Sequence, residues 1–225
     1  MSRNKLGYSL FRKERLGRSA DRKAIGEREL LTFEAILSRY RRCIELNGKK
    51  VLDLGCGDQY IRPACELRGM TYLGLDIEDC DLERDRQPIS DSTMDFAVSL
   101  ALLEHLFDPG HFFAEVQRVL RPGGVLWLST PDIQATGAKF WNDPTHVHPY
   151  TRASLRTSLQ MNGFEDVLVT PNYRCKPKNY YIESDFNFFR ARHLMPFSGI
   201  SNLRVPSFLK GGCTGMFALG RKPTS

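Results

Sequence analysis

The amino-acid sequence predicts an α/β fold in which helices cover both faces of a doubly wound, mostly parallel sheet. Three observations predict it. Residues 51–54 form a short apolar run that leads into a glycine-rich turn. A second apolar run, 72–75, ends in Asp76. Further apolar runs alternate with segments of helical periodicity, and continuous apolar runs are typical of strands buried on both faces of a sheet.

The N-terminal part is predicted to be a basic extension, residues 1–25, ahead of one globular domain, residues 26–225. Residues 1–50 hold 14 Lys or Arg against 6 Asp or Glu, a balance of +8, whereas the remainder carries −2. A basic segment can attract an anionic partner such as a nucleotide-sugar, a lipid pyrophosphate, a membrane surface or RNA. It can equally be a solvated tail, and the sequence leaves both open.

Helical periodicity and end signals predict the first two helices. The first helix is predicted from apolar residues at three- and four-residue spacing, namely Leu30, Phe33, Leu37, Tyr40 and Ile44. The pair Asn47-Gly48 then ends it. A short second helix follows the glycine turn, with Pro63 near its start and Gly69 after its end.

The later elements are predicted in the same way. One helix is expected around 112–120, because apolar residues recur there at helical spacing and Arg-Pro-Gly-Gly then breaks the pattern. Another is expected from Thr151, a residue type that caps helices, to Gly163. The remaining strands are predicted at 96–99, 125–129, 164–169 and 214–220.

The glycine turn and the acids around it predict a ligand. Gly55 and Gly57 allow a tight strand-to-helix turn and let a ligand approach bare backbone. The carboxylate of Asp76 can accept hydrogen bonds from both hydroxyls of a ribose. A dinucleotide site would need a third glycine where Tyr60 stands. Asp53, inside the first strand, would repel a pyrophosphate but suit a cation, so an adenosine-type ligand with a positive charge fits best.

Four segments in order carry a family resemblance: VLDLGCG, YLGLDIE, DFAVSLALLEHLFDP and LRPGGVLWLSTPD. They resemble class I S-adenosylmethionine-dependent methyltransferases of the small-molecule, type 11-like kind, over about residues 50–132. The resemblance implies a Rossmann-like, seven-stranded sheet whose last strand is antiparallel. It also implies S-adenosylmethionine as cofactor and methyl transfer as the reaction. The third strand of that pattern would lie in the short, charged segment 78–88.

The resemblance also implies a set of cofactor contacts. The acid and glycines of the first motif would flank the methionine part, and Asp76 would hold the ribose. Asp81-Leu82 would contact the adenine, with Asp85 as the competing choice. A Glu-His pair, 104–105, is read as structural or cofactor-adjacent. The predicted cofactor-binding residues are Asp53, Gly55, Cys56, Gly57, Asp76, Ile77, Asp81, Leu82, Ser99, Leu100 and Glu104.

A loop at 141–151, predicted to lie over the cleft, supplies the candidate catalytic residues. It resembles a loop of bacterial methyltransferases associated with surface polysaccharides and glycolipids. A sugar hydroxyl is a poor nucleophile, so a histidine base would help it to react. His146 is the first choice, with Asp143 as its orienting partner and His148 second. The alternative is that these residues only make local turn hydrogen bonds.

No metal site is predicted, because His146 and His148 on one extended loop point to opposite sides. The six cysteines form no C-x-x-C pair, so neither a zinc ribbon nor a disulfide framework is expected, and reduced thiols suggest a cytoplasmic protein. No apolar run is long enough to cross a bilayer. An insertion rich in aromatic and basic residues, about 176–212, is predicted to be a lid or acceptor-binding element. Whether it touches a membrane, and the oligomeric state, are left open.

The predicted function is methylation of a sugar hydroxyl on a glycan, glycolipid or nucleotide-sugar. The first alternative is an RNA methyltransferase, favoured only by the basic extension. Nucleic acid is not expected as a partner, because Ser99-Leu100-Ala101-Leu102 stands where nucleobase amino-methyltransferases carry their motif. The second alternative is a non-catalytic module that binds S-adenosylmethionine.

Overall fold

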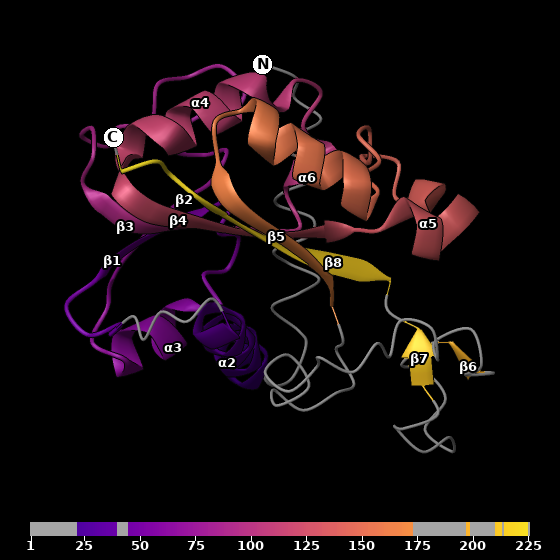
Figure 1. Cartoon of the computed structure of the whole chain (residues 1–225), viewed down its shortest axis with the longest axis horizontal. Helices are drawn as coiled ribbons and strands as arrows, with labels where there is room; N and C mark the ends of the chain where they lie inside the picture. Colours follow the sequence, from indigo (N-terminus) through magenta and orange to yellow (C-terminus); the bar gives the residue numbers. More distant parts are fainter. Residues whose placement is uncertain (1–21, 40–44, 173–196, 199–209, 213, 225) are drawn as a thin grey trace.

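The structure is a computed structural model, and a six-stranded sheet between two layers of helices is its main feature (Figure 1). The order of the strands is β2-β1-β3-β4-β8-β5. β1 to β4 pair in parallel, whereas β8 is antiparallel to both of its neighbours. The residues that the structure describes are 22–39, 45–172, 197–198, 210–212 and 214–224.

The strands occupy the apolar runs that the sequence marks. β4 begins earlier than predicted, because the backbone of Leu120 already pairs with that of Met94 ahead of the Pro-Gly-Gly turn. The antiparallel last strand is confirmed by β8, which inserts between β4 and β5. The strands are β1 (Lys50–Leu54), β2 (Thr71–Leu75), β3 (Met94–Leu100), β4 (Leu120–Pro131), β5 (Glu165–Pro171) and β8 (Gly215–Arg221).

Among the residues that the structure describes, this sheet has six strands, whereas seven were predicted. The difference lies in the segment 78–88, which forms consecutive turns instead of a strand. The Asp81 carbonyl accepts the N–H groups of Arg84 and Asp85, and the Asp85 carboxylate accepts the N–H of Asp81. These local hydrogen bonds use backbone groups that a strand would offer to the sheet.

Two helices pack on one face of the sheet, α4 (Pro109–Val119) and α6 (Arg152–Met161), above it in Figure 1. Thr151 caps α6 as predicted, and it forms a capping box with Ser154. The apolar faces of the two helices are buried in one core cluster with the strands, through Phe112, Phe113, Val116, Val119, Leu155 and Leu159.

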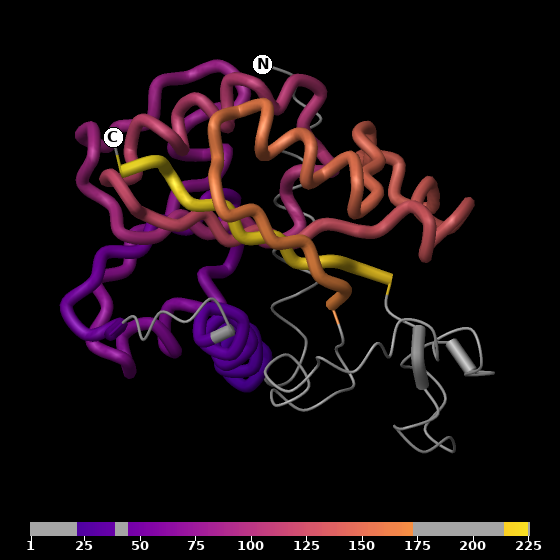
Figure 2. Tube along the Cα trace, viewed as in Figure 1, coloured from indigo at the N-terminus to yellow at the C-terminus, as the bar shows by residue number. Residues whose placement is uncertain are grey.

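The opposite face is covered by α2 (Arg22–Arg39) and α3 (Arg62–Leu67), which lie together in Figures 1 and 2. Phe33 of α2 stacks on Trp127 of β4, with ring centroids 4.7 Å apart. Gly26 lies against the turn after β1, where an added Cβ would come 2.1 Å from the Tyr60 carbonyl oxygen. The first helix is therefore docked directly on the glycine turn.

Several short elements complete the described chain. The predicted extension overlaps α2, which begins at Arg22, and residues 1–21 lie outside the described part. The predicted insertion, 176–212, lies outside it too, except for two short strands. In the part of the chain that the structure describes, no helix combines the length and apolar character needed to span a bilayer. The short elements are η1 (Leu103–His105), α5 (Ile133–Thr136), η2 (Gly137–Asn142), β6 (Phe197–Ser198) and β7 (Lys210–Gly212).

Candidate functional site

The turn after β1 presents backbone to the edge of the sheet where the parallel strands end. Gly55 and Gly57 have φ of +73° and +54°, a region that favours glycine. A Cβ on Gly57 would meet no atom within 4 Å, so its backbone faces open space. A Cβ on Gly55 would lie 3.0 Å from Leu102 Cδ1, which places the turn after β3 beside this one. Open backbone at this edge fits the approach of a ligand.

The predicted ribose-binding carboxylate is held across the ends of β1 and β2. The Gly57 N–H donates to Asp76 Oδ2 at 2.9 Å, and the Ile77 N–H donates to Asp76 Oδ1 at 2.7 Å. A carboxylate has about four lone-pair positions, and these two bonds fix the orientation of the group. The arrangement fits a ribose diol, and it joins the two motifs that the sequence singled out.

Asp53 is a buried acid in the middle of this site, 3% exposed. Tyr72 donates its hydroxyl proton to Asp53 Oδ2 at 2.6 Å. Burial raises the pKa of Asp53 to about 7, although the hydrogen bond from Tyr72 acts in the opposite direction. Among the described residues no ion pair involves Asp53. A positively charged ligand group nearby would therefore stabilise its ionised form, as a cationic cofactor would.

The two candidates for the adenine contact share one turn. Asp81 Oδ1 accepts the N–H of Glu83 at 3.1 Å, and Asp85 Oδ2 accepts the N–H of Asp81. Leu82 is buried and packs in the core cluster under α4. Ser99 is buried at the end of β3 and Leu100 is partly buried beside it. Cys56 is a buried thiol within the glycine turn.

Glu104 connects the turn after β3 to the loop at 141–151. Its side chain is 1% exposed, and Oε2 accepts the hydroxyl proton of Thr130 at 3.0 Å. Its carbonyl oxygen accepts the N–H groups of Val147 and His148 at 2.9 and 3.1 Å. The loop that carries the candidate histidines is thus anchored on η1, next to the end of β3.

The environment of His146 defines its tautomer. Nδ1 lies 2.7 Å from the Phe140 carbonyl oxygen, which can only accept, so in the neutral ring Nδ1 carries the proton and Nε2 the lone pair. Asp143 Oδ2 lies 3.9 Å from His146 Nε2, too far for a hydrogen bond. Asp143 instead accepts the N–H and the hydroxyl proton of Thr145 at 3.0 and 2.6 Å. In this structure the Phe140 carbonyl, and not Asp143, makes the hydrogen bond to His146, and the orienting role of Asp143 stays a prediction.

The other predicted histidine, His148, is in a different environment. Its ring stacks on Tyr150, with centroids 4.6 Å apart and an interplanar angle of 6°. The structure instead brings His105 close to His146, with ring centroids 4.9 Å apart. The Glu-His dipeptide after the third apolar run was visible in the sequence. Nothing in the sequence indicated that Thr145 and His146, forty residues away, would pack against it.

His105 is oriented through Thr145. Its Nδ1 lies 2.9 Å from Thr145 Oγ1 and 3.2 Å from the Thr145 carbonyl oxygen. The Thr145 hydroxyl donates its single proton to Asp143, so it accepts from His105. In neutral His105, Nδ1 is therefore protonated and Nε2 carries the lone pair.

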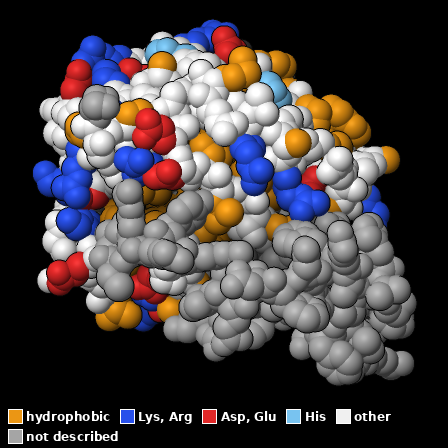
Figure 3. All heavy atoms as spheres, in the orientation of Figure 1, with side chains coloured by type: hydrophobic (Ala, Val, Ile, Leu, Met, Phe, Trp, Pro, Cys, Tyr) orange, Lys and Arg blue, Asp and Glu red, His pale blue; other side chains and the backbone are white. Residues whose placement is uncertain are grey.

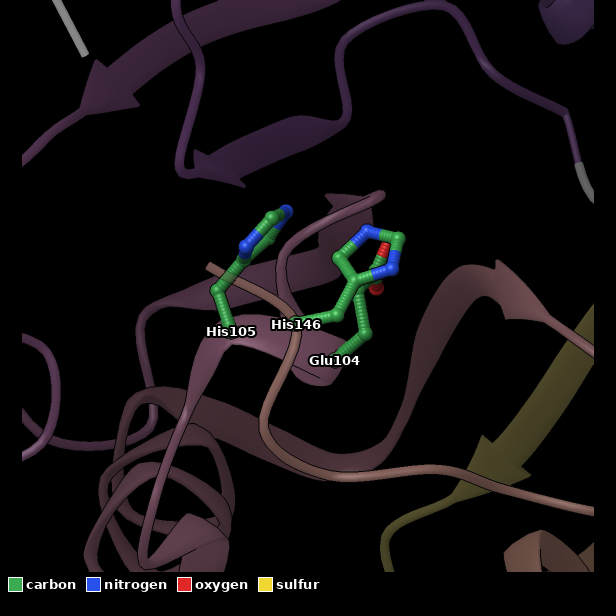
Figure 4. A group of neighbouring side chains, drawn as sticks. All are labelled: Glu104, His105 and His146. Atoms are coloured by element: carbon green, nitrogen blue, oxygen red, sulfur yellow. The ribbon is translucent and has the colours of Figure 1, made fainter. Parts of the chain in front are cut away.

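Three side chains of this region could hold a metal ion. Glu104, His105 and His146 each place one potential ligand atom within 4.8 Å of the others. Figure 4 shows the three side chains extending from η1 and the loop to the same side. His148, which the sequence analysis considered as a ligand, is not part of this group, and Glu104 and His105 take its place.

Comparisons with known proteins identify the family. Residues 28–169 match the family model described as a methyltransferase domain. A probable S-adenosylmethionine-dependent methyltransferase of Mycolicibacterium smegmatis is 30% identical over 135 residues, 52% of each chain. A ubiquinone biosynthesis O-methyltransferase of Pseudomonas putida is 31% identical over 107 residues, 39% of this chain and 46% of that one. The chain spans about half the length of these curated relatives.

Solved structures show the same fold. A methyltransferase of Archaeoglobus fulgidus superposes with a TM-score of 0.58 at 19% identity, covering 87% of this chain and 94% of that one. Phosphoethanolamine N-methyltransferase 2 of Haemonchus contortus gives a TM-score of 0.54 at 17% identity, covering 84% of this chain and 52% of that one. With the family match over more than half of its residues, the chain belongs to the S-adenosylmethionine-dependent methyltransferases.

Proposed function

We propose that this chain methylates a hydroxyl oxygen of a small molecule, with a sugar hydroxyl of a glycan, glycolipid or nucleotide-sugar as the first candidate. The observation that supports this most directly is the contact between His146 Nδ1 and the Phe140 carbonyl oxygen, which in the neutral ring places the lone pair on Nε2. That tautomer leaves Nε2 able to take a proton. A hydroxyl needs such a group at neutral pH, because its own acidity is low.

The cofactor half of the site would use the residues at the ends of β1 and β2. The open backbone at Gly57 would face the cofactor, and the Asp76 carboxylate would accept from its ribose hydroxyls. Asp53 would lie toward the positive charge of the cofactor. Burial makes the ionised form of this acid unfavourable when no cation is nearby, so a cationic cofactor would stabilise it. S-adenosylmethionine supplies an electrophilic methyl group on a positively charged sulfur.

The acceptor half would use the loop at 141–151. Contact between Gly55 and Leu102 brings η1 and its attached loop beside the glycine turn. His146 Nε2 would take the proton that the acceptor hydroxyl loses as its oxygen gains the methyl group. Holding the two reactants aligned supplies much of the acceleration in such a displacement. The two anchors of the loop on the Glu104 carbonyl would maintain that alignment.

Trp141 supports an acceptor with a ring. It is 55% exposed and packs edge-on against Phe140, whose carbonyl holds His146. An exposed aromatic side chain next to Phe140 can receive a sugar or an aromatic ring. The relative named as a ubiquinone biosynthesis O-methyltransferase also supports oxygen as the atom that is methylated.

The charge distribution gives no matching support to RNA. On the face shown in Figure 3, basic side chains of the described residues are interspersed with acidic ones and form no continuous basic surface. Nucleic-acid-binding domains usually concentrate their basic residues on one face. The basic extension, residues 1–21, lies outside the described chain, so RNA remains an outcome of the test.

The test is transfer of labelled methyl from S-adenosylmethionine to a panel of nucleotide-sugars, glycolipid precursors, phenols and RNA. We expect label in a carbohydrate hydroxyl, with kcat lowered at least 100-fold in His146→Gln. His111→Gln, a histidine of α4 outside the loop, is the matched control. Label in RNA, or in no acceptor while the cofactor still binds, would refute the proposal. Label in a phenol would keep oxygen as the atom and reject the sugar.

A further inference from the structure

We propose that Glu104, His105 and His146 bind one divalent transition-metal ion, of which Zn²⁺ is the first candidate. Two imidazoles and one carboxylate are a ligand set that Zn²⁺ and related ions take. Binding of the ion does not depend on the proposed function, but the role given to the ion in methyl transfer rests on it. In the metal-loaded chain His146 would be a ligand instead of the base: the ion would lower the pKa of the bound acceptor hydroxyl, which would release its proton to solvent before its oxygen takes the methyl group.

The three ligands come from two segments that the fold brings together. Glu104 and His105 lie on η1, whereas His146 lies on the loop that hydrogen-bonds to the Glu104 carbonyl. Their potential ligand atoms are within 4.8 Å of one another (Figure 4). Ligands about 2.1 Å from a tetrahedral ion lie about 3.4 Å apart, so each pair would approach by about 1.4 Å at most. Rotations of the side chains provide movements of this size.

The hydrogen bonds of both histidines already favour the tautomer that a metal-binding histidine has. A metal-binding imidazole donates its other N–H to a carbonyl or a carboxylate, which fixes its tautomer and orientation. For His146 the acceptor is the Phe140 carbonyl, at 2.7 Å. For His105 it is the Thr145 hydroxyl, which passes its own proton to Asp143. In each neutral ring the lone pair is therefore on Nε2.

Glu104 supplies the negative charge. The carboxylate is buried, and Thr130 orients it through a hydrogen bond to Oε2. A buried carboxylate is stabilised by a cation bound to it, so the charge favours an ion at this position. Three protein ligands leave at least one position on a tetrahedral ion for an oxygen of the acceptor or of water, which is the arrangement of catalytic metal sites.

Binding is tested on the full, tag-free chain, first by titration with Co²⁺ followed in the visible spectrum and then with Zn²⁺ by calorimetry. We expect one ion per chain, with affinity at least tenfold lower in His105→Gln and in His146→Gln. His148→Gln is the matched control from the same loop, and its affinity is expected to stay within twofold of the wild type. No stoichiometric binding, or equal affinity in all three variants, would overturn the proposal, as would a sulfur-to-cobalt charge-transfer band from cysteine ligation.

The orienting contacts give a second test that does not remove a ligand. Thr145→Val deletes the hydroxyl that accepts from His105, and such changes around a metal ligand typically lower affinity 10–100-fold. Thr145→Ser keeps the hydroxyl and should retain wild-type affinity. Equal affinity in the valine and serine variants, with both folded by circular dichroism, would contradict the orientation argued here.

The role of the ion is separated from the proposed function by chelation. Removal of the ion should lower transfer to a hydroxyl acceptor at least tenfold, and added Zn²⁺ should restore it. Full transfer by the metal-free chain would overturn the activating role. Stoichiometric binding together with transfer to no hydroxyl acceptor would support the site and reject the proposed function.

Discussion

The two proposed halves of the site, one for the cofactor and one for the acceptor, are built in different ways. The cofactor half is made by the ends of neighbouring strands, and its main contact joins Gly57 to Asp76 within two adjacent motifs. The acceptor half is made by a short turn and a loop that meet across about forty residues of sequence, through the Glu104 carbonyl and through Thr145. Short motifs thus specify the first half, whereas the second depends on tertiary packing.

The largest expected effect is on the free energy of unfolding, through Asp53, the buried acid of the cofactor half. The folded pKa of Asp53, about 7, lies above its ordinary value of 3.8, so the folded chain retains a proton that the unfolded chain releases. The free energy of unfolding should therefore fall as the pH rises from about 4 to about 7, by about 4 kcal/mol at most, and then level off. Urea unfolding at a series of pH values measures it, with Asp53→Asn as the comparison.

Asp53→Asn should remove most of this slope, because its amide oxygen can still accept from Tyr72 and carries no charge. The bound cofactor should reverse the trend, since its positive charge favours ionised Asp53 and its affinity should rise with pH over the same window. A pH slope equal in wild type and Asp53→Asn would show that another group is responsible.

The next effect is on cofactor affinity. Asp76→Ala removes the acceptor proposed for the ribose and releases the Gly57 N–H. Two hydrogen bonds to a charged group contribute about 1.5–3 kcal/mol each, so we expect the Kd for S-adenosylmethionine to rise at least about 100-fold. Calorimetry measures this, with the exposed neighbour Glu78→Ala as control. Unchanged affinity in Asp76→Ala would mean that the cofactor half has been assigned to the wrong residues.

A third test asks how the cofactor half depends on α2. Gly26→Ala would place a Cβ 2.1 Å from the Tyr60 carbonyl oxygen, so the helix must move away from the glycine turn. Overpacking of this kind costs about 1–3 kcal/mol, measured as a lower free energy of unfolding. Lys23→Ala, on the exposed side of the same helix, should change it little. Wild-type stability in Gly26→Ala would show that the contact is not tight.

The smallest effect concerns the end of the acceptor loop. Thr151→Ala removes the cap of α6 and its capping box with Ser154, which should lower the free energy of unfolding by about 1 kcal/mol. Because the cap lies outside the cofactor half, the affinity for S-adenosylmethionine should stay within twofold. Thr151→Ser retains the cap and serves as the control. A large loss of cofactor affinity in the alanine variant would mean that the two halves are coupled.

Much of the fold could be predicted because each strand of the sheet is an apolar run between recognisable turns. The exception is the segment 78–88, whose aspartates accept hydrogen bonds from neighbouring backbone N–H groups. Residue propensity alone does not decide between such turns and a strand. In the proposed site, the proximity of the glycine turn to Asp76 could be predicted because it depends on the ends of two adjacent strands, while the roles of these residues stay predictions. The pairing of His105 with Thr145 could not, since it depends on how the loop folds back.

The backbone and the side chain of Glu104 make different contacts. Its main-chain oxygen secures the loop, and every amino acid has that oxygen, whereas its carboxylate faces Thr130 and the histidines. Replacement of the side chain would therefore change the charge beside His105 and His146 and leave in place the carbonyl oxygen that holds the loop.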